Sequence, residues 1–237
     1  MLDSLTLALS PEESRALWLS VKVAAWCVLL SVIPAIALAW LLARCQFWGK
    51  AIVEALVLLP MILPPVVIGY VLLLFFGQQG TGGQWLAQWG LMLPFHWTGA
   101  VVASMLMSLP LFVQPIRLSL QQIDRRTEQA ARVLGASPWR VLWSVTLPLS
   151  ASGILTGAVL AFGRSLGEFG ATISFVGNID GQTRTLPLAI YSAIQQPNGE
   201  HMAMRLIMLS ILLAGVALWI SHVISHRQQK RLGLADV

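Results

Sequence analysis

Long apolar runs alternate with short polar segments along this chain. Residues 55–116 contain no Asp, Glu, Lys or Arg at all. Because a transmembrane helix needs about 20 mostly apolar residues, runs of this length predict membrane spans. The pattern predicts an all-α, polytopic membrane helix bundle, formed by the single domain 1–237 and crossing the bilayer at about residues 17–43, 51–77, 97–119, 148–177 and 203–225.

Composition agrees with an integral membrane protein. The chain is 57% hydrophobic and 11% charged, with a mean hydropathy of +0.74, whereas soluble domains carry about 25% charged residues. We interpret the net charge of +5 as loop charge near a membrane, and expect no nucleic-acid partner. Cys27 and Cys45 are too far apart for a metal clip, so we expect neither a metal site nor a disulfide framework.

Basic residues are unevenly distributed among the loops. The 43–50 loop holds Arg44 and Lys50 and the 117–140 loop holds five arginines, while the 78–96 loop has neither Lys nor Arg. Cytoplasmic loops of membrane proteins carry an excess of Lys and Arg. With five spans, the bias predicts an N-terminus outside and a C-terminus in the cytoplasm.

The cytoplasmic segment 124–147 has strong helix signals. Asp124 is a suitable N-cap, and Gly135 is placed where a glycine ends a helix. Ser137 and Pro138 restart a second helix as N-cap and first residue, which Pro148 then bends at the membrane. We expect a helix-turn-helix on the membrane face, offered to a partner; the alternative is a basic loop that only fixes topology.

No nucleotide site is evident in the chain. The glycines of the 77–83 segment lack the Gly-Lys-Ser/Thr ending of a phosphate-binding loop. Any ATP hydrolysis therefore belongs to another chain.

Ionisable residues inside a span are candidates for function. Arg164 and Glu168 are one helical turn apart and can pair on one face; a structural pair at a dimer interface is the alternative to a gate. Prolines in the second span remove backbone donors, which suits a cavity-lining helix as well as simple kinking. The candidate pathway or gate residues are Pro64, Pro65, Arg164, Ser165, Glu168 and Thr172.

The spacing within the 124–147 loop resembles the coupling loop of bacterial ABC importer permeases. That pattern is Glu-Ala-Ala, three residues, Gly, nine residues, Ile-x-Leu-Pro. Its glutamate aligns here with Gln129, and Glu128 lies one residue earlier. The resemblance implies a cytoplasmic coupling helix that docks on an ATPase through Glu128, Gln129, Ala130, Ala131, Arg132, Gly135, Leu147 and Pro148.

Segments 63–70 and 164–172 are similar to oxyanion importers of this family, especially molybdate permeases, with sulfate and tungstate permeases as alternatives. The resemblance implies a bacterial inner-membrane transport subunit that is not an enzyme and needs no cofactor. It also implies contact with two ABC ATPase subunits, a second permease copy and a periplasmic or lipid-anchored substrate-binding protein. A homodimer is expected, and a heterodimer stays open. An ion-coupled secondary transporter is the competing class, although the chain shows no internal repeat; a co-purifying ATPase would discriminate.

Overall fold

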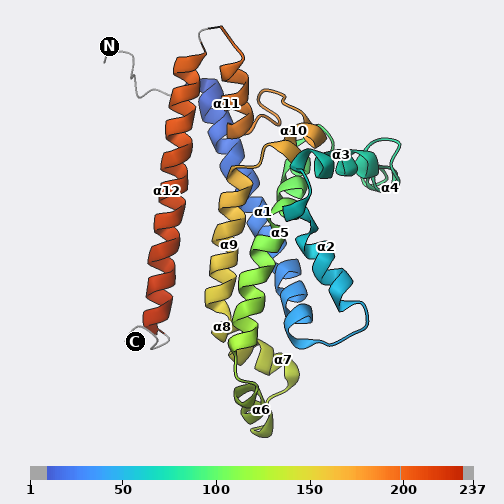
Figure 1. Cartoon of the computed structure of the whole chain (residues 1–237), viewed down its shortest axis with the longest axis vertical. Helices are drawn as coiled ribbons and strands as arrows, with labels where there is room; N and C mark the ends of the chain where they lie inside the picture. The colour runs from blue at the N-terminus through green and yellow to red at the C-terminus, as the bar shows by residue number, and fades with distance from the viewer. Residues whose placement is uncertain (1–9, 198, 232–237) are drawn as a thin grey trace.

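The computed structural model describes residues 10–197 and 199–231, with only the backbone of 221, 222 and 224–231 (Figure 1). Every regular element in these ranges is helical, which confirms the all-α fold. The helices are α1 (Pro11–Arg44), α2 (Lys50–Ile62), α3 (Pro65–Phe76), α4 (Thr81–Ala87), α5 (Trp97–Gln122), α6 (Arg125–Val133), α7 (Pro138–Val141), the π-helix η1 (Leu142–Thr146), α8 (Leu147–Leu149), α9 (Ala151–Leu166), α10 (Gly170–Val176), α11 (Leu186–Ile194) and α12 (Glu200–Arg231).

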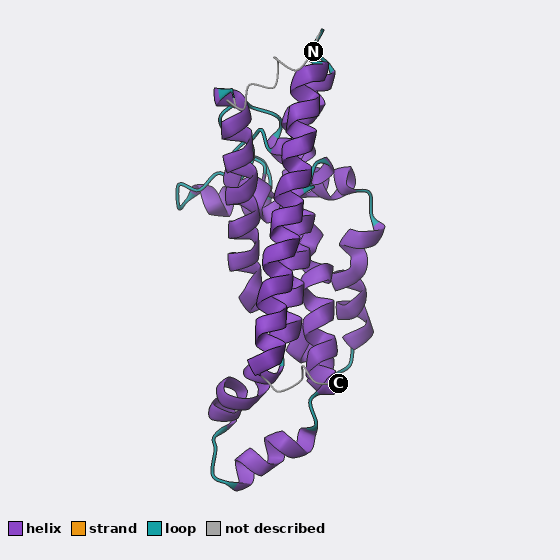
Figure 2. Ribbon diagram, turned by 90° about the vertical axis from the view of Figure 1, so that its left-hand side faces the viewer, coloured by secondary structure: helices purple, strands orange, loops and turns teal. Residues whose placement is uncertain are grey.

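Helices α1, α5 and α9 pack along their length and form the centre of the bundle (Figure 1). In the view turned by 90°, long helices stand side by side between the two ends of the molecule (Figure 2). Small residues allow this close approach, as in many membrane helix pairs. A Cβ atom on Gly157 of α9 would lie 2.7 Å from the carbonyl oxygen of Phe112 in α5. Ala35 and Ala39 of α1 are fully buried in the same cluster as Phe112.

Three helices are long and apolar enough to cross a membrane within the described part of the chain: Pro11–Arg44, Trp97–Gln122 and Glu200–Ile220. Two bent helix pairs bring the number to 5 if each pair is one span. These helices overlap the five ranges that the apolar pattern predicts, whose exact limits stay predictions.

The second predicted span, 51–77, is not one continuous helix. The chain bends by 114° between helices α2 and α3. Because a residue before proline avoids the α region, Leu63 and Pro64 are extended, with ψ of 144° and 132°. Pro65 then starts α3 at a position where its missing N–H costs nothing.

The fourth predicted span, 148–177, is divided twice. The Pro138–Leu149 segment bends by 64° against α9, close to Pro148, as expected. Helix α9 ends at Leu166, and the short helix α10 begins at Gly170. The continuous helix of this span therefore ends at Leu166 and does not extend to residue 177.

Helix α12 stands at one edge of the bundle and packs mainly on α11 and α9 (Figure 1). At its beginning, Arg205 forms a 3.0 Å ion pair with the fully buried carboxylate of Glu13 in α1. Helix α6 lies at the opposite end of the molecule from α11 and the start of α1 (Figure 1). The fold therefore separates two polar ends by the apolar bundle.

Candidate functional site

The loop between α5 and α9 forms the helix-turn-helix that its sequence predicts. The Asp124 carboxylate accepts the backbone N–H of Arg126 at 2.9 Å and caps α6. Gly135 follows α6 with φ of +86°, a conformation that glycine adopts without steric cost. The Ser137 hydroxyl accepts the N–H of Arg140 and caps α7. The local expectations for both caps and the turn are confirmed.

Glu128 turns toward the bundle and fixes α6 to it. Its Oε1 atom lies 3.1 Å from Nη2 of Arg44, at the end of α1. The same oxygen accepts the hydroxyl hydrogen of Thr146, in η1, at 2.8 Å. Only 16% of the Glu128 side chain and 11% of the Arg44 side chain are exposed, so the pair is largely shielded from water.

The outer side of this loop is open. No residue of α6 is buried, and Val133 and Leu134 are each 87% exposed. Trp139 on α7 is also largely exposed. Exposed apolar side chains that stand next to each other are a common sign of a protein contact surface.

The structure divides the predicted coupling residues into two groups. The Glu128 side chain is mostly buried, whereas its neighbours on α6 and in the turn are exposed or partly exposed: Gln129, Ala130, Ala131, Arg132 and Gly135. Leu147 and Pro148 lie in α8, directly after Thr146. The Glu128–Thr146 hydrogen bond therefore brings both ends of the motif together.

The breaks in the second and fourth predicted spans pack against each other. A Cβ atom on Gly170, the first residue of α10, would lie 2.8 Å from Cβ of Pro65, the first residue of α3. One turn further along α3, a Cβ atom on Gly69 would clash with the backbone of Ala171. Helices α3 and α10 thus touch at backbone distance.

A hollow of about 350 Å³ opens at this junction, lined by Pro65, Val66, Arg164, Gly167, Glu168, Phe169 and Gly170. Arg164 and Glu168 form the expected ion pair, with Nη1 and Oε2 2.6 Å apart. The other carboxylate oxygen accepts the N–H of Ala171 at 2.8 Å and so caps α10. Glu168 is almost fully buried, while 28% of the Arg164 side chain is exposed toward the hollow.

This arrangement has a definite chemistry. An arginine carries five N–H donors in a fixed plane, and one carboxylate oxygen engages only part of them. The pair is formally neutral, yet Arg164 can still donate to a second acceptor.

The remaining candidate pathway residues do not line the hollow. Pro64 is exposed at the break between α2 and α3, whereas Ser165 and Thr172 are buried in the bundle. The structure therefore brings Pro65, Arg164 and Glu168 together and leaves the other three outside.

Three features were missed in the sequence. Two of them are the partners of Glu128. Arg44 is distant from Glu128 in the sequence, and Thr146 lies in an apolar segment, so nothing local indicates either contact. The exposed pair Val133 and Leu134 could have been found, because two apolar residues at the end of a charged helix have no core to face.

Comparisons with known proteins identify the family of this chain. Residues 35–232 match the family of binding-protein-dependent transport system inner membrane components. The chain is 51% identical to the molybdenum transport system permease protein ModB of Haemophilus influenzae, over 95% of this chain and 99% of that protein. It is 50% identical, with the same shares covered, to ModB of Escherichia coli K12. It is 34% identical to the sulfate transport system permease protein CysW of Synechocystis, over 90% of this chain and 76% of that protein.

Solved structures show the same fold. A bacterial alginate ABC transporter, in complex with a pentasaccharide-bound periplasmic protein, matches with a TM-score of 0.73 at 18% identity, over 98% of this chain and 83% of that chain. The inward-facing MetNI methionine ABC transporter matches with a TM-score of 0.69 at 16% identity, over 93% and 99%. The chain belongs to the family of binding-protein-dependent transport system inner membrane components, the multi-pass permeases of ABC transporters, in which a separate ATPase hydrolyses ATP.

Proposed function

We propose that this chain forms the membrane pathway of an ATP-driven molybdate importer. The observation that carries the proposal is the identity of 50–51% to molybdenum permeases across 95% of the chain. Sulfate is the second candidate, because the sulfate permease CysW is also a relative, at 34%. Tungstate, a tetrahedral dianion like molybdate, is the third.

Two copies of the chain enclose the pathway, and two ATPase subunits dock on residues 124–147. The N-terminus lies outside and the C-terminus in the cytoplasm. Gln129, Arg132, Val133 and Leu134 face the ATPase, since their side chains are exposed. Glu128 instead transmits the movement of α6 to α1 and η1 through Arg44 and Thr146.

The mechanism is alternating access. ATP binding draws the two ATPase subunits together and carries the docked α6 helices with them. The pathway then opens outward, toward a periplasmic or lipid-anchored binding protein, and hydrolysis returns it to the inward-open state. The broken spans support this mechanism, because α3 and α10 are short segments that pack on the continuous helix α5 and can shift on it as units.

Arg164 and Glu168 form a gate at the α3–α10 junction. The exposed part of Arg164 meets the passing dianion, and Glu168 lowers the local positive potential. This balance prevents the tight binding that an unpaired arginine would produce in a low-dielectric site.

The decisive experiment reconstitutes the chain with its ATPase and its binding protein in proteoliposomes. We expect ATP-dependent uptake of molybdate at low concentration that excess sulfate does not inhibit. Uptake of sulfate with no uptake of molybdate would overturn the substrate and keep the transporter class. Uptake of either anion without ATP would overturn the mechanism.

A further inference from the structure

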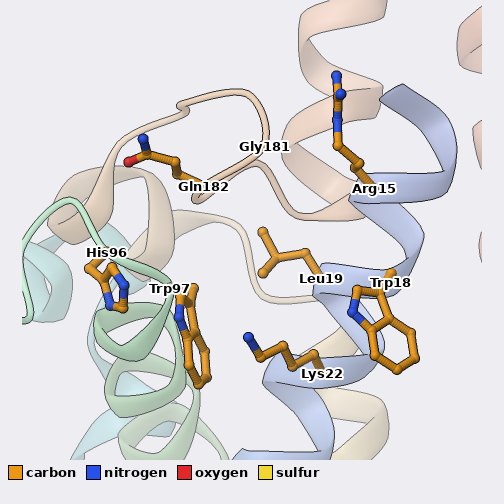
Figure 3. Close-up of a pocket in the computed structure, with 8 residues that line it drawn as sticks. All are labelled: Arg15, Trp18, Leu19, Lys22, His96, Trp97, Gly181 and Gln182. Carbon is orange, nitrogen blue, oxygen red and sulfur yellow. The ribbon is translucent and has the colours of Figure 1, made fainter. Parts of the chain in front are cut away.

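A second pocket lies at the end of the molecule opposite α6. Its volume is about 480 Å³, within the range of small-ligand sites. Four side chains come from α1, two residues from the start of α5, and two from the loop before α11 (Figure 3). They are Arg15, Trp18, Leu19, Lys22, His96, Trp97, Gly181 and Gln182.

Lys22 is the cation of this pocket that has no carboxylate partner. Its ammonium nitrogen lies 3.6 Å from the centre of the Trp97 ring, and no carboxylate of the described residues is within 4.0 Å of it. A cation over an aromatic face is held in place, but its N–H donors still need acceptors. Lys22 is therefore oriented and available to an anion.

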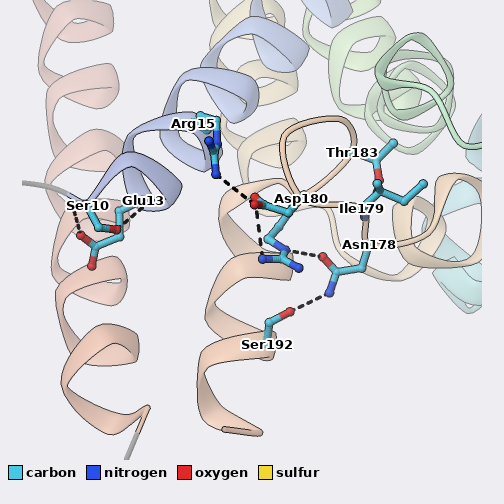
Figure 4. A network of polar contacts seen from close by, with 9 residues as sticks. Ser10, Glu13, Arg15, Asn178, Ile179, Asp180, Thr183 and Ser192 are labelled. Carbon is cyan, nitrogen blue, oxygen red and sulfur yellow. Dashed lines mark hydrogen bonds and ion pairs between the residues drawn. The ribbon is translucent and has the colours of Figure 1, made fainter.

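The other cation of the pocket is already engaged. Arg15 lies 2.9 Å from the carboxylate of Asp180, which also faces Arg184 at 3.8 Å (Figure 4). Asn178 accepts from Arg184 and donates to Ser192. This network fixes the 178–184 loop against α1 and builds the upper wall of the pocket.

The level of the pocket in the membrane follows from α5. Trp97 is the first residue of this spanning helix and so marks the boundary of the hydrocarbon core. Because Lys22 contacts Trp97, its ammonium group lies at the same boundary. Trp18, on the neighbouring face of α1, is 68% exposed. Tryptophans concentrate at the level of the lipid headgroups, and the positive end of the α5 dipole adds to the charge of Lys22.

We propose that this pocket binds the phosphate of an anionic phospholipid. The apolar walls formed by Trp18, Leu19 and Trp97 fit the beginning of the acyl chains, and Lys22 fits the phosphate. A free hydrated oxyanion carries a similar charge but has no apolar part that could contact these side chains. On the topology proposed above, the lipid belongs to the outer leaflet.

The proposal assigns a new contact to the loop before α11. Gly181 and Gln182 line the pocket, so the headgroup touches the loop as well as α1 and α5. A bound lipid therefore stabilises the position of this loop.

The test uses the complete transporter, purified with its ATPase subunits, and native mass spectrometry of lipid binding. Dioleoylphosphatidylglycerol is titrated against dioleoylphosphatidylcholine on the wild type and on Lys22→Gln, Lys22→Arg and Lys50→Gln. We expect the wild type to prefer phosphatidylglycerol, and Lys22→Gln to weaken its binding about fivefold, the contribution of one lysine near an anionic surface. Lys22→Arg and the control Lys50→Gln, at the other membrane face, keep wild-type binding.

Equal weakening in Lys22→Gln and Lys50→Gln would overturn the proposal, because the effect would then follow overall charge. Displacement of phosphatidylglycerol by millimolar inorganic phosphate or molybdate would assign the pocket to a free oxyanion instead. If Lys22→Gln fails to assemble, the test rests on the wild-type transporter. Equal binding of phosphatidylglycerol and phosphatidylcholine to it would overturn the proposal. The experiment measures lipid binding and not transport. A negative result would therefore overturn the lipid site without bearing on the proposed importer function.

Discussion

Reversing the charges of Arg44 and Glu128 tests whether this ion pair connects α6 to the membrane domain. The two residues are separated by 84 positions in the chain, and their side chains meet at 3.1 Å. We consider Arg44→Glu, Glu128→Arg and the double variant that restores the pair in the opposite sense.

The expected size of the effect follows from the contacts of α6. None of its 9 residues is buried, so apolar packing contributes little to its attachment. A hydrogen bond to a charged group contributes about 1.5–3 kcal/mol, and the low exposure of both side chains prevents water from replacing it. Since 1.4 kcal/mol corresponds to a factor of ten, losing the pair shifts the attachment equilibrium of α6 by roughly ten- to a hundredfold.

The assay measures molybdate uptake and ATP hydrolysis in the same proteoliposomes. Each single variant is expected to lower uptake per ATP at least tenfold, while hydrolysis continues. The double variant should recover most of the ratio. The reasoning is refuted if the single variants keep the wild-type ratio, or if the double variant, assembled normally with the ATPase, is no better than the poorer single variant.

Three further predictions follow from the backbone and the hollow. Gly135→Asp adds a side chain at a left-handed residue, where Asp is tolerated better than most residues, and a charge on the side that we propose docks on the ATPase. We therefore expect an assembled complex with little uptake per ATP; normal uptake would contradict the proposed coupling role. Gly157→Ala pushes a methyl group against Phe112 and should cost about 1–3 kcal/mol, seen as a lower melting temperature of the complex, whereas Gly163→Ala meets nothing within 4 Å and should not lower it; equal melting temperatures would be evidence against the close packing. Glu168→Gln keeps an acceptor for the first turn of α10 but loses the ion pair, and Glu168→Ala loses both, so uptake should fall in the order wild type, Gln, Ala; an Ala variant as active as the Gln variant would contradict the capping role.

The local structure of the coupling loop could be predicted because its signals act over three or four residues. Asp124 and Ser137 cap the helices that follow them, and Gly135 ends the first one. Capping depends on side-chain chemistry beside a backbone N–H, and the sequence displays it directly.

The breaks in the spans were harder to place. Hydropathy averages over a window and cannot show that Pro64 and Pro65 turn the chain by 114°. Helix α9 ends at its C-cap, Gly167, and Glu168 then accepts the N–H of Ala171 in α10. A glutamate three residues before a helical N–H is not a strong sequence signal.

Contacts between distant segments could not be predicted at all. A single sequence does not indicate which arginine pairs with Glu128, because Arg44 lies 84 positions away from it. The hollow at Pro65 and Gly170 likewise depends on how two broken spans pack.

Glu128 lies one residue before the glutamate position of the coupling-loop pattern that this segment resembles. Its position determines the sign of the surface that α6 presents. One step along an α-helix rotates a side chain by about 100°, which directs this carboxylate to the guanidinium at the end of α1 and leaves the neutral Gln129 outside. The exposed charges of α6 are then the guanidinium groups of Arg125, Arg126 and Arg132. A carboxylate-lined cleft on the ATPase would be drawn to this helix from a distance, and the rate at which the two subunits associate should fall as ionic strength rises.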